Sequence, residues 1–422
     1  MTASAPGAGP VGGAAVSPSR AWLLFLLLCV AGVFNAMDRP IIAILKPDMS
    51  ADFGWTDADF GRLAAVTQFA AAMSFLLTGW LVDRLGVRRA MIVGVSAWSL
   101  AAMLHGWART GTQVIAARMG LGVTEAVQTP LTIKTVATLF APNRRSLAIG
   151  IGTALASAGT ISMPFFIPPM AAAFGWRGAL VFAGVAGFVV LALWLFAARG
   201  VQLDAGDVAS DGQAHDDARE PIGRILARRA TWAILGAKAL SDATWWLMNF
   251  WLPDFYRREF DLTTSQLAVP LAIAFAGSAL GAVGAGWLST RLLERGVPVD
   301  RVRKGVLLVS ALVVLPVPLV LALDSFWPVA IMMGVVLAGH QGFSLTLFSI
   351  ITDVFPRAAV GRVTALGAFV GNLGGMTIVW VTGVTLTAGA GYTPLFAFAA
   401  VSYLLAFLWL RLLLPRIVRA DA

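Results

Sequence analysis

Two pairs of charged residues stand within segments that are otherwise apolar, and their types suit ion-coupled chemistry. Asp38 and Arg39 are adjacent in FNAMDRPIIAI. Arg118 and Glu125 lie in ARMGLGVTEAVQTP, where a spacing of seven returns them to nearly one helix face, about 10 Å apart. A charge in mid-membrane costs about 2.5–3.5 kcal/mol on insertion scales, so each needs a partner or a use. We predict that Asp38 pairs with Arg118. We also predict that Arg39 pairs with Glu125.

These pairs suggest a device that couples an anion to a proton. Arg39 neutralises one carboxylate well, not two, so an organic anion that takes it in a bidentate contact leaves Glu125 without its cation. Glu125 then captures a proton, and by linkage its protonation frees Arg39 for the anion. Asp38 with Arg118 could carry a second proton in the same way. The alternative is a structural role, although buried ion pairs stabilise poorly because desolvation cancels much of their attraction.

The composition places these charges in a membrane protein. Of the 422 residues, 58% are hydrophobic and only 13% are charged, and the mean hydropathy is +0.80. A soluble domain is about one quarter charged, so a soluble enzyme, a nucleic-acid binder and a disordered scaffold are excluded. The sequence contains no Walker motif, zinc-ligand cluster or nucleophile elbow, so we expect no enzyme activity, no cofactor and no metal. Cys29 is the single cysteine, so no intramolecular disulfide can form.

The apolar segments predict twelve transmembrane helices. Backbone groups in lipid must satisfy their own hydrogen bonds, and these segments are too long and too evenly apolar for barrel strands. We therefore predict an all-α integral membrane protein. The predicted spans are 21–43, 60–82, 90–108, 112–135, 146–169, 176–198, 230–256, 264–290, 304–323, 327–351, 361–386 and 391–414.

The basic residues predict the orientation. Twelve spans put both termini on one side, and that side holds 21 of the 31 Lys and Arg residues, against 6 on the other. By the positive-inside rule both termini are cytoplasmic. This asymmetry accounts for the net charge of +9 without a nucleic-acid partner.

The chain is expected to consist of two pseudo-symmetric six-helix halves. We predict a cytoplasmic tail (1–20), an N-terminal half (21–198), a charged cytoplasmic linker (199–229) and a C-terminal half (230–422). A weak repeat supports the division, because LFAPNRRSLAIG and VFPRAAVGRVTALG occupy the same place in each half. Many secondary transporters are built this way, with the binding site between the halves.

The segment GWLVDRLGVRR (79–89) resembles the G-x-x-x-D-R-x-G-x-R-R signature of the major facilitator superfamily. Gly79 is expected to permit close helix approach and Asp83 to cap or pair with a neighbouring helix end. Arg84 and Arg88 are expected to anchor the cytoplasmic surface, and the cluster to latch the halves in one state. The alternative is an ordinary basic loop. The corresponding segment of the second half, GWLSTRLLERG, is a weaker copy with Thr290 in place of the aspartate.

Four further segments resemble the anion:cation symporter family, in particular its hexuronate-transporter branch. They are NAMDR (35–39), RMGLGVTEAVQTPLTIK (118–134), KALSDATWWLMNFWLPDF (238–255) and GHQGFSLTLFSIITDVFP (339–356). The resemblance implies symport of a sugar acid with protons across the bacterial inner membrane. It also implies that Asp38 and Glu125 handle protons and that Arg39 binds the substrate carboxylate. We expect a monomer in the lipid bilayer that binds a small organic anion.

This sequence departs from the branch at three tyrosines, which are replaced by Ala36, Ala71 and Met248. The replacements predict a roomier, less polar pocket. A carrier of another carboxylate, such as an aromatic or dicarboxylic acid, therefore stays open, as do an organic-acid exporter and a transporter-like sensor.

Further pocket candidates lie in the second half. His340, Gln341 and Ser344 could bond sugar hydroxyls, although an intramembrane histidine can equally serve helix packing. Trp245, Trp246 and Asn249 could supply a stacking wall and an amide, and the alternative for the tryptophans is an interfacial belt. Asn372 in GNLGG is an uncharged polar group at depth. Lys134 and Lys238 are expected to extend toward the nearer membrane surface, and Asp242 to pair with Lys238.

Overall fold

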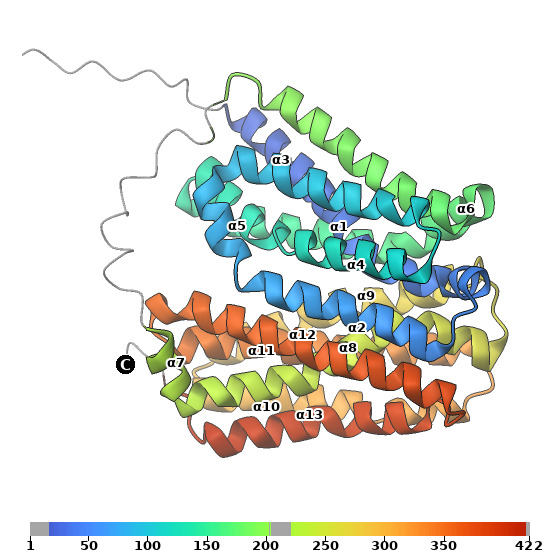
Figure 1. Cartoon of the computed structure of the whole chain (residues 1–422). Coiled ribbons are helices and arrows are strands. Elements are labelled where there is room, and N and C mark those ends of the chain that lie inside the picture. Colours follow the sequence, from blue (N-terminus) through green and yellow to red (C-terminus); the bar gives the residue numbers. More distant parts are fainter. Residues whose placement is uncertain (1–16, 202, 204–220, 419–422) are drawn as a thin grey trace, which may run out of the picture.

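A computed structural model describes residues 17–201, 203 and 221–418, and every regular element in these ranges is a helix (Figure 1). The elements are α1 (Pro18–Phe53), α2 (Asp57–Phe75), α3 (Thr78–Trp107), α4 (Gly111–Glu125), α5 (Gln128–Leu139), α6 (Pro142–Ala197), α7 (Ile222–Ala227), α8 (Arg229–Phe260), α9 (Ala268–Glu294), α10 (Val299–Val314), the 3-10 helix η1 (Val317–Ala322), α11 (Phe326–Val354), α12 (Arg357–Thr387) and α13 (Thr393–Leu413).

The helices account for the twelve predicted spans. In the described ranges, eight helices are long and apolar enough to cross a membrane. One of these, α6, is 56 residues long and holds the fifth and sixth spans, which turn at Gly175 (φ 68°, ψ 173°). The second span runs from α2 into the start of α3, the α4–α5 pair forms the fourth, and α8 forms the seventh. The prediction of an all-α, twelve-helix membrane protein is confirmed.

The helix boundaries differ from the predicted ones near glycine and proline residues. The expected loop after the second span is a turn at Gly86 (φ 75°), a backbone conformation that glycine adopts without strain. α1 continues past the predicted end at residue 43 and stops at Gly54 (φ 64°), despite Pro40 and Pro47. Lys46, expected in a loop, is therefore buried within a helix.

The helices form two groups that lie side by side (Figure 1). α1 packs against α6 and α3 against α4 and α6, whereas α8 to α13 pack among themselves. Contacts between the groups run from α2 to α12, from α6 to α9 and from α1 to α8. At the α2–α12 contact a Cβ placed on Gly61 would lie 3.0 Å from the Gly383 Cα, so the two backbones meet directly.

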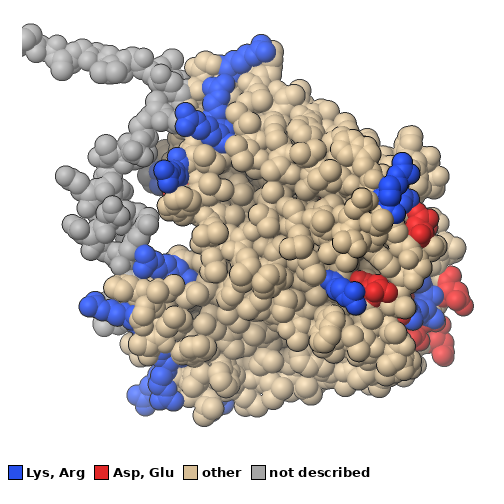
Figure 2. Space-filling view, viewed as in Figure 1, with Lys and Arg blue, Asp and Glu red and all other residues tan. Residues whose placement is uncertain are grey.

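The predicted terminal tail and linker lie largely outside the described residues. Within the described part of the predicted tail (17–20), Pro18 already begins α1. Of the predicted linker 199–229, the described residues include the short helix α7 and the start of α8. On the face shown in Figure 2, Lys and Arg appear without Asp or Glu at the left-hand end, whereas both kinds of charge appear together at the right-hand end.

A buried ion network ties the two groups together at the end opposite the termini. The Lys46 ammonium of α1 lies 2.6 Å from Asp57 Oδ1 of α2 and 2.5 Å from Asp254 Oδ1 of α8. Arg258 contacts both carboxylates, at 2.6 and 2.7 Å. The Tyr392 hydroxyl donates to Asp254 Oδ2 at 2.7 Å. Because the network joins α1 and α2 to α8, it holds this end of the molecule closed.

Replacing Lys46 by methionine is expected to open that end. Without the ammonium, only Arg258 is left to offset the charges of Asp57 and Asp254 in a poorly solvated place, and breaking a buried pair typically costs about 3–5 kcal/mol. Amides of residues 54–60 and 388–392 should then exchange with deuterium at least about tenfold faster, as measured by mass spectrometry on the purified protein. The matched control is Glu259→Gln, an exposed position on the same turn of α8, which should exchange like the parent. Unchanged exchange in the Lys46 variant would show that the network is not a closing contact.

Candidate functional site

The centre of the site is the ion pair between Arg39 and Glu125. Arg39 Nε donates to Glu125 Oε2 at 3.0 Å, and the Glu125 side chain is fully buried whereas that of Arg39 is 19% exposed. The guanidinium carbon also lies 4.9 Å from the ring centroid of Trp246 on α8. Arg39 therefore contacts both halves of the molecule, through Glu125 in the first and Trp246 in the second. The predicted Arg39–Glu125 contact is present in the structure.

Two prolines account for the backbone around this pair. Pro40 has no N–H, so the carbonyl of residue 36 loses its usual intrahelical donor next to Arg39. α4 ends at Glu125 and α5 begins at Gln128, two residues before Pro130. The Asn35 side chain donates to the Glu125 carbonyl at 3.3 Å, across this break. The carboxylate is thus held at a helix end, where a small backbone change can move it.

The second predicted pair takes a different form from the one expected. Arg118 Nη2 donates to the main-chain carbonyl of Asp38 at 3.0 Å, so Arg118 contacts Asp38 through its backbone. Considering the described residues, Asp38 Oδ1, Arg118 Nε and Nη1 and Glu125 Oε1 are buried without a hydrogen-bond partner. Side chains of this kind are normally satisfied in protein interiors. The carboxylate oxygens of this cluster can therefore still accept a proton, and its unpartnered atoms can still form hydrogen bonds to water.

A cavity of about 170 Å³ lies between the two groups of helices, and Ala36, about one turn before Arg39 on α1, is part of its wall. Its wall is made of residues from five helices: Ala36 of α1, Thr153, Ala156, Ser157 and Thr160 of α6, Trp245 of α8, Phe275 and Ser278 of α9, and Gln341 of α11. The predicted pocket residues Trp245 and Gln341 line it directly. The cavity is therefore walled by both halves, with hydroxyls of α6 on one side and the rings of Trp245 and Phe275, the Ser278 hydroxyl and the Gln341 amide on the other.

His340 supports this wall through Trp245, and Ser344 accepts a hydrogen bond from Lys238 at 3.3 Å. The His340 ring stacks on Trp245, with centroids 4.8 Å apart and planes 13° apart. The Tyr403 hydroxyl donates to the Ser241 carbonyl at 2.9 Å and lies 2.6 Å from His340 Nδ1, from which it can accept. Of the two interpretations of His340, the geometry favours helix packing, with the imidazole supporting Trp245.

The two predicted asparagines bond to protein groups. Asn249 donates to the Trp245 carbonyl at 2.9 Å, within its own helix. Asn372 donates to the Ala368 carbonyl at 2.8 Å and accepts from Gln68 of α2 at 3.4 Å. Asn372 therefore joins α12 to α2, and neither amide belongs to the residues that line the 170 Å³ cavity.

The signature segment 79–89 lies at the end from which the termini emerge. Asp83 pairs with Lys134 of α5, whose ammonium is 3.6 Å from Asp83 Oδ1 and 2.9 Å from its carbonyl. Arg84 lies over the Trp80 ring at 5.4 Å, and Arg88 also has an interaction partner. The expected reason for Gly79 is wrong in this conformation, because a Cβ there would meet no atom within 4 Å. The gating role of the segment stays a prediction.

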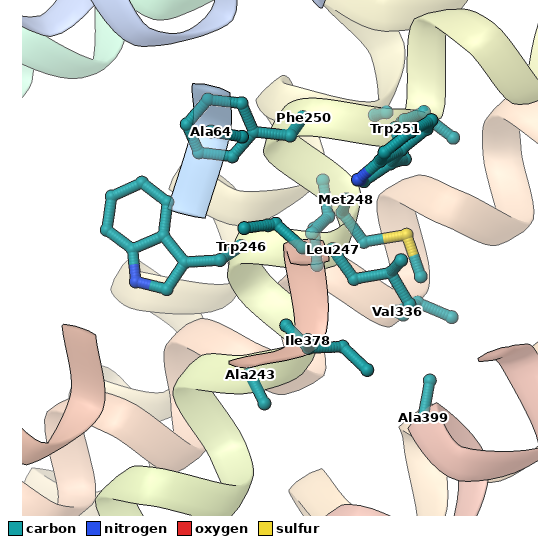
Figure 3. Close-up of a cluster of buried hydrophobic side chains, with 14 of the residues drawn as sticks. Ala64, Ala243, Trp246, Leu247, Met248, Phe250, Trp251, Val336, Ile378 and Ala399 are labelled. Carbon is teal, nitrogen blue, oxygen red and sulfur yellow. The ribbon is translucent and has the colours of Figure 1, made fainter. Parts of the chain in front are cut away.

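Only one of the three tyrosine replacements borders the cavity. Ala36 lines it, whereas Ala71 is fully buried next to Gly122 of α4. Figure 3 shows Met248 pointing into a cluster with Leu247 and Val336. The expectation that Met248 enlarges the pocket is therefore wrong, since this side chain packs in the core of the second half.

Reasoning from the sequence missed several polar partners of the site. Asn35 and Gln68 are uncharged and gave no distinctive spacing signal. His105 is fully buried, and its Nδ1 lies 2.8 Å from the Ala101 carbonyl. Lys46 was expected in a loop and no role was predicted for Asp254, whereas both are buried within helices.

This fold and this site define a membrane transporter with a central binding region between two helical bundles. Residues 28–346 match the model of the Major Facilitator Superfamily, and the chain belongs to that family. It is therefore a transporter rather than an enzyme.

The comparisons also show which proteins the chain resembles. It is 22% identical over 415 residues to the D-galactonate transporter of Escherichia coli O6:H1, with 92% of this chain and 95% of the relative covered. It is 23% identical to the probable galactarate/D-glucarate transporter GudP of Bacillus subtilis, with 94% and 92% covered. Among solved structures, a bacterial homologue of the human lysosomal transporter Spinster, inward-facing and occupied, has a TM-score of 0.74 at 18% identity and covers 94% of this chain and 96% of its own. The D-xylose-proton symporter has a TM-score of 0.71 at 12% identity, with 94% and 98% covered. At these identities the structures show the fold alone.

Proposed function

We propose that the protein is a proton-coupled symporter that imports an organic anion, a sugar acid of the hexuronate or aldonate type, by alternating access. The observation that carries the proposal is the Arg39–Glu125 pair, in which a cation one turn of α1 from the cavity-lining Ala36 is bound to a buried carboxylate. A substrate carboxylate competes for the same guanidinium, and the displaced Glu125 takes a proton.

The surroundings of Arg39 support a sugar acid as the cargo. Hydroxyls of α6 and the amide of Gln341 can bond sugar hydroxyls, and Trp245 offers a flat apolar face to a sugar ring. Relatives named for transport of galactonate and of galactarate and glucarate support the same class.

The location and direction belong to the same proposal. We place the protein in the inner membrane with both termini in the cytoplasm, on the side rich in Lys and Arg. The ion network of Lys46 then closes the outer end, as expected for a state that releases cargo inward. The same proposal takes a monomer as the functional unit.

The test is uptake into proteoliposomes of the purified protein. Labelled galactonate should accumulate when the lumen is alkaline, and an ionophore that dissipates the pH gradient should abolish accumulation while leaving counterflow intact. Unlabelled glucuronate, galactarate and benzoate serve as competitors to rank the substrate classes. Strong competition by benzoate with weak competition by sugar acids would favour an aromatic-acid carrier. Binding without counterflow would indicate a sensor and contradict the proposal.

A further inference from the structure

A second buried ion pair lies in the C-terminal half, and the coupling scheme does not use it. Lys238 Nζ is 2.7 Å from Asp242 Oδ2 and 2.9 Å from Oδ1, and it donates to Ser344 Oγ of α11 at 3.3 Å. The expectation that Lys238 extends to the membrane surface is wrong, because its side chain is only 6% exposed. The ammonium also lies 4.9 Å from the Phe348 ring.

The pair continues the face of α8 that lines the central region. Lys238, Asp242 and Trp246 are spaced by four, so they follow one another along a single helix face. Trp246 contacts the Arg39 guanidinium, and Trp245 lines the cavity. Cavity-lining and Lys238-contacting residues follow one another along α11 as well. Gln341 lines the cavity, and Ser344, about one turn further along the helix, contacts Lys238.

Asp242 also faces the junction of the two halves. A Cβ on Gly371 of α12 would lie 2.2 Å from Asp242 Oδ2, so α12 packs directly on this carboxylate. The next residue, Asn372, accepts a hydrogen bond from Gln68 of α2 in the other half. The Asp242 side chain is 13% exposed, more than that of Lys238. The Lys238–Asp242 pair therefore lies close to the contact between the two bundles.

We propose that Lys238, together with Ser344, forms a second anion-binding subsite that takes the carboxylate at the far end of a substrate whose first carboxylate is bound by Arg39. The inference rests on the proposed function, in which Arg39 binds the first carboxylate. Asp242 is the resident competitor for Lys238, as Glu125 is for Arg39. A diacid therefore displaces two carboxylates, whereas a monoacid displaces one.

The spacing suits an extended sugar diacid. Asp242 is one turn from Trp246, about 6 Å along α8, and Arg39 lies over Trp246. The Lys238 ammonium contacts Asp242 and the Arg39 guanidinium contacts Trp246, so the points at which the two cations meet α8 are about one helical turn apart, on the scale of a six-carbon chain. Trp245 and Gln341 line the cavity, where they can contact the sugar hydroxyls of such a chain.

The test compares galactarate, a diacid, with galactonate, a monoacid, as competitors of labelled galactonate counterflow. Lys238→Gln should weaken inhibition by galactarate about tenfold or more and change that by galactonate less than about threefold. Lys238→Arg should keep the preference of the parent. Asp242→Asn should strengthen galactarate inhibition, because the competing charge is gone.

The expected effects of Lys238→Gln and Asp242→Asn on galactarate inhibition are opposite, and this difference separates a binding role of the pair from a structural one. If the pair only stabilises the bundle, both neutral variants affect both acids in the same direction, and the subsite is disproved. The matched control is Lys304→Gln, which breaks a similarly spaced pair with Asp300 (2.6 Å) on α10 and should leave both acids unaffected. If the parent carries neither acid, the proposed function fails. If the parent carries galactonate but Lys238→Gln shows no selective loss, only the subsite fails.

Discussion

Replacing Arg39 by alanine is expected to reduce substrate affinity about a hundredfold or more and to abolish uptake. The guanidinium supplies two charge-assisted hydrogen bonds to a carboxylate, each worth about 1.5–3 kcal/mol. Without it, Glu125 loses the cation to which it is hydrogen-bonded, so its protonation no longer depends on whether substrate is bound. The measurement is initial uptake of labelled galactonate by proteoliposomes, over a range of concentrations.

Two further variants test whether the loss of uptake is specific to the Arg39 guanidinium. Arg39→Lys keeps the charge but loses the planar fork, so it should fall between the parent and the alanine variant. Arg62→Ala removes a cation whose side chain is 63% exposed, and it should transport like the parent. Parental uptake by the Arg39→Ala protein would remove the basis of the binding model.

Replacing Glu125 by glutamine is expected to separate transport from proton coupling. The amide keeps the shape of the side chain and mimics the protonated acid, so the anion still finds Arg39 available. Counterflow should stay within about threefold of the parent, whereas accumulation against a gradient at alkaline internal pH should disappear. The measurement is the steady-state ratio of internal to external galactonate with and without a pH gradient.

The matched control for this substitution is Glu294→Gln at the end of α9, an exposed position. It should accumulate substrate like the parent. If the Glu125 variant accumulates substrate as the parent does, Glu125 is not the coupling group. A variant that loses counterflow as well would assign Glu125 to substrate binding.

The sequence was sufficient for the fold because lipid imposes simple rules. Apolar runs of about twenty residues must be helices, and their number and spacing gave the twelve spans. Boundaries were harder to predict, since they depend on single residues. At Gly86 and Gly175 the backbone is not helical and one helix ends where the next begins, whereas α1 passes through Pro40 without ending.

The site was predictable where charge was the signal. Arg39 and Glu125 were paired in advance because uncompensated charges are costly in a membrane, and the structure has them in contact. Which side of α8 and of α11 faces the cavity could not be predicted from charge in the same way. Met248 and His340 lie on the same apolar helices as Trp245 and Gln341, and only packing decides which of them faces the cavity.

The most direct test of the account is to count protons when the anion binds. Purified protein in weak buffer with a pH indicator is mixed with saturating galactonate, and the protons taken up are compared with the anions bound. The account predicts uptake by the parent, and about one proton fewer per anion in Glu125→Gln. Equal proton uptake by both proteins, or anion binding by the parent with none, would contradict the exchange of a carboxylate for a proton at Arg39.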